Sequence, residues 1–496
     1  MNFTPITQSF LNIRQKYPAW VFLTAAALSG VLLIHAGRIF FDDDPTPSVL
    51  LFGSNFLSSA GVLLMVFAAI GTVTYWLERR GVDRFSLAIF AVAGLVSLHY
   101  LHVSCNNAYT NDWYQMGGGH FPYADFISKH PLNPYGFHGW EEHHPPVYYY
   151  FAGAMIVFAK TIETLPVLTM VRFLSCFFTL WFSAFGLLTL RRAGLPTAIY
   201  RACAVLFLLW PAGIHLASKI SNEPMYYACY AAAFYYALVW YQDNKDNQLM
   251  RALLWAGVGF TVRTNAIVVF AVIAALVLAA WCRERFDFRR LYSEEWGLVA
   301  LWLAIFLIIN SGRIIIHSLD PGELAYHFGT GTSRHVPLSN FLIFNYKNFI
   351  ISPFNTWSGA QTFWDYLLKT MLYGEYRWRN PDLARLLNLM ECMIVLYITL
   401  TWLMLRRGEM QGKEMFPYVA AVLLPLAFHM IFMMWKSSMN NQDARYVYPM
   451  LPCFCVLYGR ALVLLDERRS VLLPVGIGLA YSFAALSVIF FWGQVR

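Results

Sequence analysis

Long apolar runs separated by short charged loops dominate the chain. Most runs have roughly 18 to 25 residues, the length at which a helix crosses about 30 Å of hydrocarbon. The strands of a membrane β-barrel alternate in polarity over segments of about 10 residues, whereas these runs are continuously apolar. The pattern therefore predicts an all-α polytopic membrane protein. The predicted spans cover residues 19–40, 49–77, 85–103, 167–190, 199–217, 224–241, 297–317, 384–405, 417–435, 446–465 and 471–493.

Composition supports this class. The chain has 496 residues, of which 58% are hydrophobic and 13% are charged. A soluble protein carries about 25% charged residues, so a soluble globular protein is excluded. The net charge of +8 does not indicate nucleic-acid binding, because the arginines lie in short loops and form no basic face with interleaved aromatics. The eight cysteines show neither a disulfide framework nor a zinc-ligand spacing.

The placement of lysine and arginine orients the spans, since short cytoplasmic loops are rich in both. Residues 252–282 have basic residues at both ends and are expected to form a hairpin with Arg263-Thr264-Asn265 at its outer tip. Residues 145–164 are expected to form a juxtamembrane or re-entrant helix. With these two assignments the chain has about 13 crossings, an inner N-terminus and an outer C-terminus. The basic loops predicted to face the cytoplasm contain Arg79, Arg80, Arg84, Arg191, Arg192, Arg406, Arg407, Lys413, Arg468 and Arg469.

Two long segments, 104–145 and 318–382, fall on the outer side in this topology. They are too rich in tryptophan, tyrosine and phenylalanine to be disordered. We expect them to form a small extramembrane layer of short helices. The chain then divides into two additional N-terminal helices within residues 1–80 and a catalytic domain over residues 81–496.

Asp112 follows the span that ends near Val103, so a rigid helix would hold it at the outer surface. A carboxylate there can act as a general base toward an acceptor hydroxyl. The alternative is a solvated loop residue or a helix N-cap.

A polar group follows at Glu141, Glu142, His143 and His144, immediately before two prolines that can start a helix. It could bind a sugar, bind a metal, act as acid and base, or only pack. Sequential residues point in different directions and no i, i+4 ligand pair is present. Substrate binding or polar packing is therefore favoured over metal binding, and the sequence requires no cofactor; a divalent metal is possible but has no support.

Glu223 lies in a short outer turn before Pro224, where the helix dipole also favours a carboxylate. Arg263 and Arg445, the latter followed by Tyr446, are predicted on the outer side, against the usual bias of arginine. A phosphate at the headgroup level would explain them, because arginine binds phosphate oxygens bidentately. Alternatively, Arg445 pairs with Asp443 or extends to the interface.

The topology brings these polar positions to one surface, which suits a lipid-linked phosphate donor whose sugar enters an aromatic cavity. The order of motifs also resembles the GT-C superfamily of membrane glycosyltransferases, in particular the branch that uses polyprenyl-phosphate sugars and includes protein O-mannosyltransferases and bacterial aminoarabinose transferases. The motifs are Asp112-Trp-Tyr-Gln, His143-His-Pro-Pro-Val-Tyr-Tyr, Val171-Arg172-Phe-Leu-Ser, Ser221-Asn-Glu223-Pro, the segment from Gly257 to Asn265, and the segment from Ala444 to Pro452.

The resemblance implies that Asp112 is the catalytic base and that Glu223 matches a second acidic position. It implies that basic residues near Arg263 and Arg445 hold the lipid phosphate. Glu142, His143, His144 and Tyr446 are expected to contribute to substrate binding. The implied reaction is an inverting transfer of sugar from a polyprenyl-phosphate carrier to a hydroxyl of a glycan, lipid or protein, on the outer face of the membrane. A bacterial plasma membrane, with the site facing the periplasm or exterior, is favoured over the endoplasmic reticulum, because no lumenal accessory domain is appended.

Two other functions are open from sequence. A secondary transporter or flippase of a lipid-linked sugar is disfavoured, because such proteins place charges near the bilayer midplane. A noncatalytic protein that binds a lipid-linked sugar would have the same fold.

Overall fold

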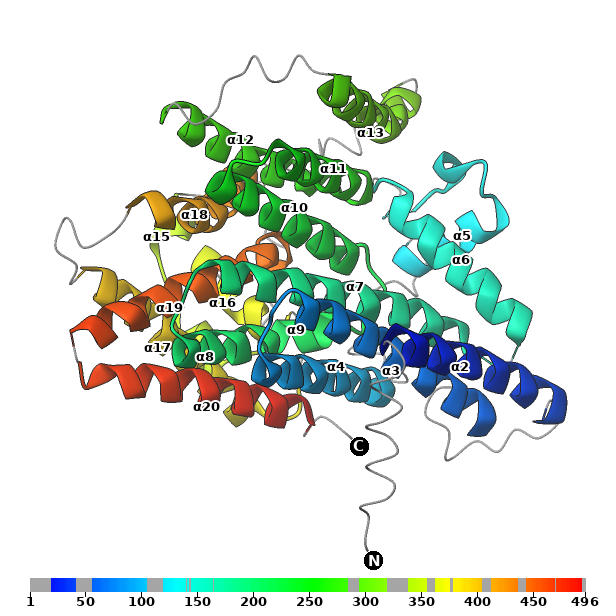
Figure 1. The fold of residues 1–496 in the computed structure, drawn as a ribbon, viewed down its shortest axis with the longest axis horizontal. Helices are drawn as coiled ribbons and strands as arrows, with labels where there is room; N and C mark the ends of the chain where they lie inside the picture. Colours follow the sequence, from blue (N-terminus) through cyan, green and yellow to red (C-terminus); the bar gives the residue numbers. More distant parts are fainter. Residues whose placement is uncertain are drawn as a thin grey trace, which may run out of the picture.

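The computed structural model describes residues 19–41, 56–104, 119–139, 141, 144–163, 165–283, 294–318, 338–354, 362–374, 378–403, 412–435, 443–468 and 470–492. Within these ranges every regular element is a helix (Figure 1). The predicted all-α class is therefore confirmed for the described part of the chain.

The long helices follow the predicted apolar runs. They are α2 (Ala19–Phe41), α3 (Phe56–Arg79), α4 (Arg84–Ser104), α7 (Val167–Arg192), α10 (Glu223–Asp243), α11 (Asp246–Val262), α12 (Ile267–Trp281), α13 (Glu294–Ser318), α17 (Pro381–Leu403), α18 (Gly412–Trp435), α19 (Leu451–Glu467) and α20 (Leu472–Trp492). The shorter helices are α5 (His120–Lys129), α6 (Val147–Ile162), α8 (Thr197–Leu208), α9 (Pro211–Leu216), α15 (Ser339–Leu342) and α16 (Phe363–Tyr373).

Eight helical stretches of the described chain are long and apolar enough to cross a membrane, judged by length and composition. The predicted count of about 13 crossings remains a prediction. The eight stretches are Leu57–Arg79, Arg84–His102, Val167–Arg192, Thr264–Trp281, Pro381–Leu403, Glu414–Met434, Tyr448–Glu467 and Leu472–Trp492.

Two of the basic loops that the charge pattern placed on one side meet at one end of the bundle. Gly81, after α3, packs directly against the guanidinium of Arg191 at the end of α7. Arg192 pairs with Asp243 at the end of α10, with 3.0 Å between Nη2 and Oδ2. These contacts place three loops together, and we call this end of the bundle the basic end.

The predicted hairpin within residues 252–282 is confirmed. Its tip is next to the start of α10, since Arg263 Nη1 lies 2.7 Å from the Glu223 carboxylate. Its far end returns to the basic end, where Arg283 donates to the hydroxyl of Tyr241. Helices α11 and α12 therefore run back and forth beside α10, which is buried along almost its whole length.

The prediction of one continuous span over 199–217 is wrong. This stretch forms two helices, α8 and α9, which are separated near Trp210. Pro211 explains the break, because proline has no amide hydrogen to donate and clashes with the preceding helical turn. The indole nitrogen of Trp210 donates to the carbonyl of Met371 at 2.6 Å, so α16 is attached at the break.

The long loops contain short helices, as expected. Helix α5 packs on α6, whereas α16 packs on α9 and on residues 444–446. Helix α6 has 16 residues. At 1.5 Å per residue it is about 24 Å long, shorter than the hydrocarbon layer, which is consistent with the predicted juxtamembrane or re-entrant helix.

The N-terminal helices α2 and α3 lie side by side at one edge of the molecule (Figure 1). Their contact is tight at two glycines. A Cβ added to Gly30 would lie 2.7 Å from the carbonyl oxygen of Gly61, and a Cβ added to Gly61 would lie 2.5 Å from that of Gly30. Small residues allow such close approach of membrane helices. Helix α3 also contacts α4 and α7, which connects the pair to the rest of the bundle.

Candidate functional site

A buried ion pair forms the centre of the candidate site, at the end of α10 away from the basic end. Arg263 Nη1 donates to Glu223 Oε1 at 2.7 Å and to Asn222 Oδ1 at 3.2 Å. The side chains of Arg263 and Glu223 are only 5% and 2% exposed. The second carboxylate oxygen of Glu223 accepts from the Ser221 hydroxyl at 2.7 Å. The turn before α10 and the tip of the hairpin are thereby fixed to each other.

Arg445 approaches the same carboxylate from a different direction and is more exposed. Its Nη1 lies 3.7 Å from Glu223 Oε1, and its Nε lies 3.6 Å from Asp443 Oδ2. Both ion pairs are long, and 31% of the Arg445 side chain is exposed. Of the two arginines, Arg445 is the one whose guanidinium can reach a ligand from solvent.

The ring of Tyr446 lies close to both cations. The guanidinium carbons of Arg263 and Arg445 are 5.2 Å and 5.5 Å from the centre of its ring. These distances are within the range of cation–π attraction. His429 stacks on the same ring at 5.2 Å, so the ring has a fixed orientation.

The segment that carries Arg445 is held by its neighbours. The backbone amide of Arg445 donates to the Asp443 carboxylate at 3.0 Å, and its carbonyl accepts from the Tyr227 hydroxyl at 3.0 Å. The amide of Ala444 donates to the hydroxyl of Thr370 on α16 at 2.9 Å. Helices α10 and α16 thus position the segment together.

The two arginines determine the protonation state of Glu223. Burial alone would raise the pKa of Glu223, but Arg263 and then Arg445 outweigh burial and hold that pKa well below its usual range. Glu223 is therefore ionised near neutral pH. Two guanidinium groups face the carboxylates of Glu223 and Asp443, and Lys219 also acts on Glu223, which leaves the group with an excess of positive charge.

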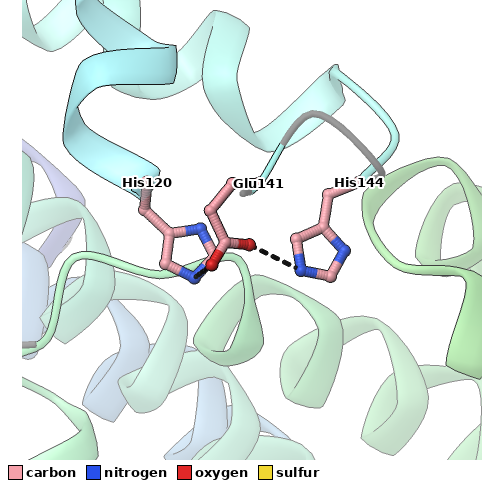
Figure 2. Close-up of side chains that lie close together, drawn as sticks. All are labelled: His120, Glu141 and His144. Atoms are coloured by element: carbon pink, nitrogen blue, oxygen red, sulfur yellow. Dashed lines mark ion pairs between the residues drawn. The ribbon is translucent and has the colours of Figure 1, made fainter. Parts of the chain in front are cut away.

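A second polar cluster lies in the segment between α4 and α6. The carboxylate of Glu141 lies between two imidazole rings, those of His120 and His144 (Figure 2). His144 Nε2 is 2.9 Å from Glu141 Oε2, and His120 Nε2 is 3.6 Å from Oε1. The other ring nitrogen of His120, Nδ1, is 2.7 Å from the hydroxyl of Tyr149.

Tyr149 on α6 connects the two clusters. Both the Glu141 carboxylate and the Arg263 guanidinium act electrostatically on its hydroxyl. His120 in turn acts on Glu223. The imidazole cluster and the arginine cluster are therefore parts of one polar region at this end of the bundle.

An apolar cavity of about 230 Å³ lies between the helices. Its walls come from α3, α4 and α7 and from the broken helix α8–α9. Tyr448 lines the cavity, and its ring lies 5.2 Å from that of Tyr227, which holds the Arg445 carbonyl. The cavity thus reaches to within one side chain of the Arg445 segment.

The structure brings together Glu223, Arg263, Arg445 and Tyr446, as predicted, and places His144 in the neighbouring cluster. Asp112, Glu142 and His143 lie outside the described residues. The sequence prediction missed His120, which is 21 residues upstream of Glu141 and has no spacing signal. Glu141 lies in the predicted polar run but is not among the predicted site residues. The predicted alternative for Arg445, pairing with Asp443, coexists with its approach to Glu223.

Comparisons with known proteins find similarity at the level of structure. No protein-family model matches the chain, and the curated proteins contain no matching sequence. One similar solved structure is the archaeal oligosaccharyltransferase AglB from Archaeoglobus fulgidus in complex with an inhibitory peptide and a dolichol-phosphate. Its TM-score is 0.47 and its identity is 14%, over 83% of this chain and 56% of that chain. The chain thus spans about half the length of this oligosaccharyltransferase.

Two further similar structures are ArnT from Cupriavidus metallidurans bound to undecaprenyl phosphate and the arabinosyltransferase EmbB from Mycobacterium smegmatis. ArnT has a TM-score of 0.37 and 13% identity, over 76% of this chain and 77% of that chain. EmbB has a TM-score of 0.41 and 12% identity, over 83% of this chain and 34% of that chain. All three proteins are GT-C glycosyltransferases, the group that the sequence motifs resemble. Because every TM-score is below 0.5, we assign roles only from the residues of this chain.

Proposed function

We propose that this protein is a membrane glycosyltransferase that transfers a sugar from a polyprenyl-phosphate carrier to an acceptor hydroxyl on the outer face of the membrane. The observation that carries the proposal is the meeting of Glu223, Arg263 and Arg445, with an apolar cavity that Tyr448 and Tyr227 connect to the Arg445 segment. A lipid phosphate has the matching chemistry, an anionic head joined to a long apolar tail. The sugar and the acceptor class are left to experiment.

Arg445 is the proposed phosphate ligand, and Arg263 is a positioning residue. Arg263 is buried and donates to Glu223 and Asn222, whereas the Arg445 side chain is 31% exposed and its ion pairs with Glu223 and Asp443 are long. Glu223 orients both cations. The donor phosphate would then bind bidentately to Arg445, and Tyr446 would hold the planar group in place.

Asp112 is the proposed base. Its carboxylate accepts the proton of the acceptor hydroxyl while that oxygen forms a bond to the anomeric carbon. The bond between that carbon and the phosphate oxygen breaks, and the polyprenyl phosphate leaves with the bonding electron pair. Attack from the face opposite to the leaving group inverts the configuration. Fixed positive charge beside a leaving phosphate stabilises the charge that grows there.

The apolar cavity is the proposed seat of the tail next to the phosphate. Ala69 on α3 is one of the residues that line it. Ala69→Phe is expected to fill part of the cavity and to weaken binding of undecaprenyl phosphate, but not of a short-chain alkyl phosphate. Phe67→Leu, at an exposed position of the same helix, is the control. If Ala69→Phe weakened the binding of both phosphates equally, this assignment would be contradicted.

Release of polyprenyl phosphate and transfer of labelled sugar, measured in nanodiscs with a panel of polyprenyl-phosphate sugars, test the function. Wild type is expected to turn over one donor, and Asp112→Asn is expected to bind it without turnover. Arg445→Ala is expected to weaken phosphate binding about tenfold to a hundredfold, because charged hydrogen bonds contribute about 1.5–3 kcal/mol. Arg460→Ala on α19, whose guanidinium donates to the Ala193 carbonyl, is the control. Wild-type turnover by Asp112→Asn, or substrate-dependent ion flux in proteoliposomes, would overturn the proposal.

A further inference from the structure

We propose that His120, Glu141 and His144 form a binding site for a divalent transition metal, with zinc the best match. The geometry of the three ligands and of the groups behind them supports this assignment, and it does not depend on the proposed function.

The three residues bring one ligand atom each into a small space. These atoms all lie within 4.8 Å of one another, with 2.9 Å and 3.6 Å separating the Glu141 oxygens from the two Nε2 atoms. Tetrahedral zinc with bonds of about 2.0–2.2 Å to nitrogen and oxygen needs ligand atoms about 3.3 Å apart. The two carboxylate–imidazole distances lie on both sides of this value and involve different oxygens, so rotations of the side chains would bring one atom of each residue to tetrahedral spacing.

The group behind His120 also matches a metal site. Imidazole ligands of metals usually bond through their second nitrogen to another polar group, which fixes the tautomer and the ring orientation. Here Nδ1 of His120 lies 2.7 Å from the hydroxyl of Tyr149. When Nδ1 carries the proton and donates it to this oxygen, the lone pair of Nε2 points toward Glu141. Tyr149 is fully buried and packs on Tyr123 with 4.0 Å between ring centres, so it cannot turn away easily.

A simple ion-pair network is a weaker explanation of the cluster. The rings of His120 and His144 are nearly parallel, with an angle of 8° and 5.7 Å between centres. Two ion pairs with Glu141 would require two protonated imidazoles at this distance, and like charges so close repel each other. A network of neutral rings would instead require both to donate through Nε2, with Nδ1 of His120 accepting from the Tyr149 hydroxyl. A single metal ion satisfies the carboxylate and both neutral rings together. The two histidines are 6% and 7% exposed, which shields such a site from competing water.

Three protein ligands leave the fourth position of a tetrahedral zinc ion for an exogenous oxygen. Because Tyr149 lies within the influence of both Glu141 and Arg263, the site adjoins the proposed phosphate subsite. If the proposed function holds, a phosphate oxygen or a hydroxyl of the substrate has the chemistry to take this position. This last step rests on the proposed function, whereas metal binding does not.

The test begins with metal binding alone. Full-length protein is stripped with a chelator in detergent and titrated with Zn²⁺ and Co²⁺, with bound metal measured by mass spectrometry and the Co²⁺ geometry by visible absorption. We expect about one ion per chain and a tetrahedral Co²⁺ spectrum. His120→Asn and Glu141→Gln are expected to weaken binding at least a hundredfold, and Tyr149→Phe about tenfold. His130→Asn, an exposed histidine at the end of α5, should bind as wild type does.

Two outcomes would overturn the site. One is binding by wild type that is no tighter than binding by His120→Asn. The other is equal loss in His130→Asn, which would indicate adventitious surface binding. If a ligand variant fails to fold, a second measurement tests the site. Zn²⁺ should then raise the melting temperature of stripped wild type and of Tyr149→Phe, because a ligand that binds the folded state stabilises it. No rise in wild type would also refute the proposal.

Failure of the proposed function is recognised separately. Metal binding without sugar transfer from any donor would leave the site in place and remove the glycosyltransferase. Sugar transfer that persists at full rate in protein without bound metal would keep the enzyme and remove any role of the metal in it. Inorganic phosphate added to the Co²⁺ form tests the fourth position. A changed absorption spectrum supports an exchangeable ligand there, and an unchanged one refutes it.

Discussion

Two carboxylates at the same end of the bundle have opposite surroundings. Glu223 is 2% exposed and is surrounded by fixed cations, whereas the side chain of Glu141 is 19% exposed and faces two imidazoles. The negative charge of the first carboxylate is balanced by arginine side chains of the chain itself. The second lies with two imidazole rings, and one ligand atom from each of the three residues lies within 4.8 Å of the other two. The difference indicates that the first cluster builds the fold and shapes a ligand site, while the second is suited to receive a positive ion.

The largest expected effect comes from removing the buried cation. Arg263→Met should destabilise the protein by about 3–5 kcal/mol, because it removes the close ion pair of the buried Glu223 carboxylate and leaves the long pair to Arg445. Thermal unfolding in detergent measures this as a large fall in melting temperature. Arg251→Met, which removes an exposed arginine of the same helix, is the matched control. Equal melting temperatures for the two variants would show that the pair does not hold the hairpin to α10.

Lowering the pH should destabilise the protein through protonation of Glu223. Its pKa is lowered in the folded protein, so its contribution to stability is complete above the unfolded pKa of about 4.3 and is lost as the pH falls below that value. The free energy of unfolding should therefore lose up to about 1.4 kcal/mol per pH unit from this group below about pH 4. Unfolding measured across pH in wild type and in Glu223→Gln checks this, since the variant should be less stable at pH 7 and lose less on acidification. Parallel pH curves would contradict it.

Tyr446 tests how far the aromatic ring contributes to the arginine cluster. Tyr446→Leu should cost about 0.5–2 kcal/mol, because it removes cation–π contacts with both guanidinium groups. Tyr446→Phe keeps the ring and should remain close to wild type. Chemical or thermal unfolding of the two variants gives the comparison, and similar losses in both would point to the hydroxyl instead of the ring.

The smallest effect is expected at the second carboxylate. Glu141→Gln should change stability by less than about 1 kcal/mol in metal-free protein, because ion pairs of a partly exposed carboxylate contribute little. The same substitution should abolish the stabilisation that added Zn²⁺ gives. A loss as large as that of Arg263→Met, measured without metal, would erase the contrast between the two clusters.

Sequence patterns predicted the parts of this structure that depend on period and charge. Apolar run lengths located the long helices, and the basic residues at both ends of 252–282 predicted the hairpin that brings Arg263 to Glu223. The break at Trp210 was missed although Pro211 signals it, because the run remains apolar across the proline.

The second cluster could not be predicted in the same way. A short helix and a loop separate His120 from Glu141 in the sequence. The course of a loop depends on tertiary packing, which a periodic sequence pattern does not predict. His144 was expected to bind substrate, and its position beside Glu141 adds the metal-site proposal to that prediction. The roles of Asp112, Glu142 and His143 remain predictions from sequence.

Two neighbouring residues of α16 join parts of the site that are far apart in the sequence. Thr370 accepts the amide of the Arg445 segment, and the carbonyl of Met371 accepts the indole at the break whose flanks, Leu208 and Gly213, line the apolar cavity. A shift of this one helix would therefore displace both the segment proposed to bind the anionic head and the wall of the cavity proposed to bind the hydrocarbon tail. Preference for head group and preference for chain length are therefore expected to change together in variants of α16.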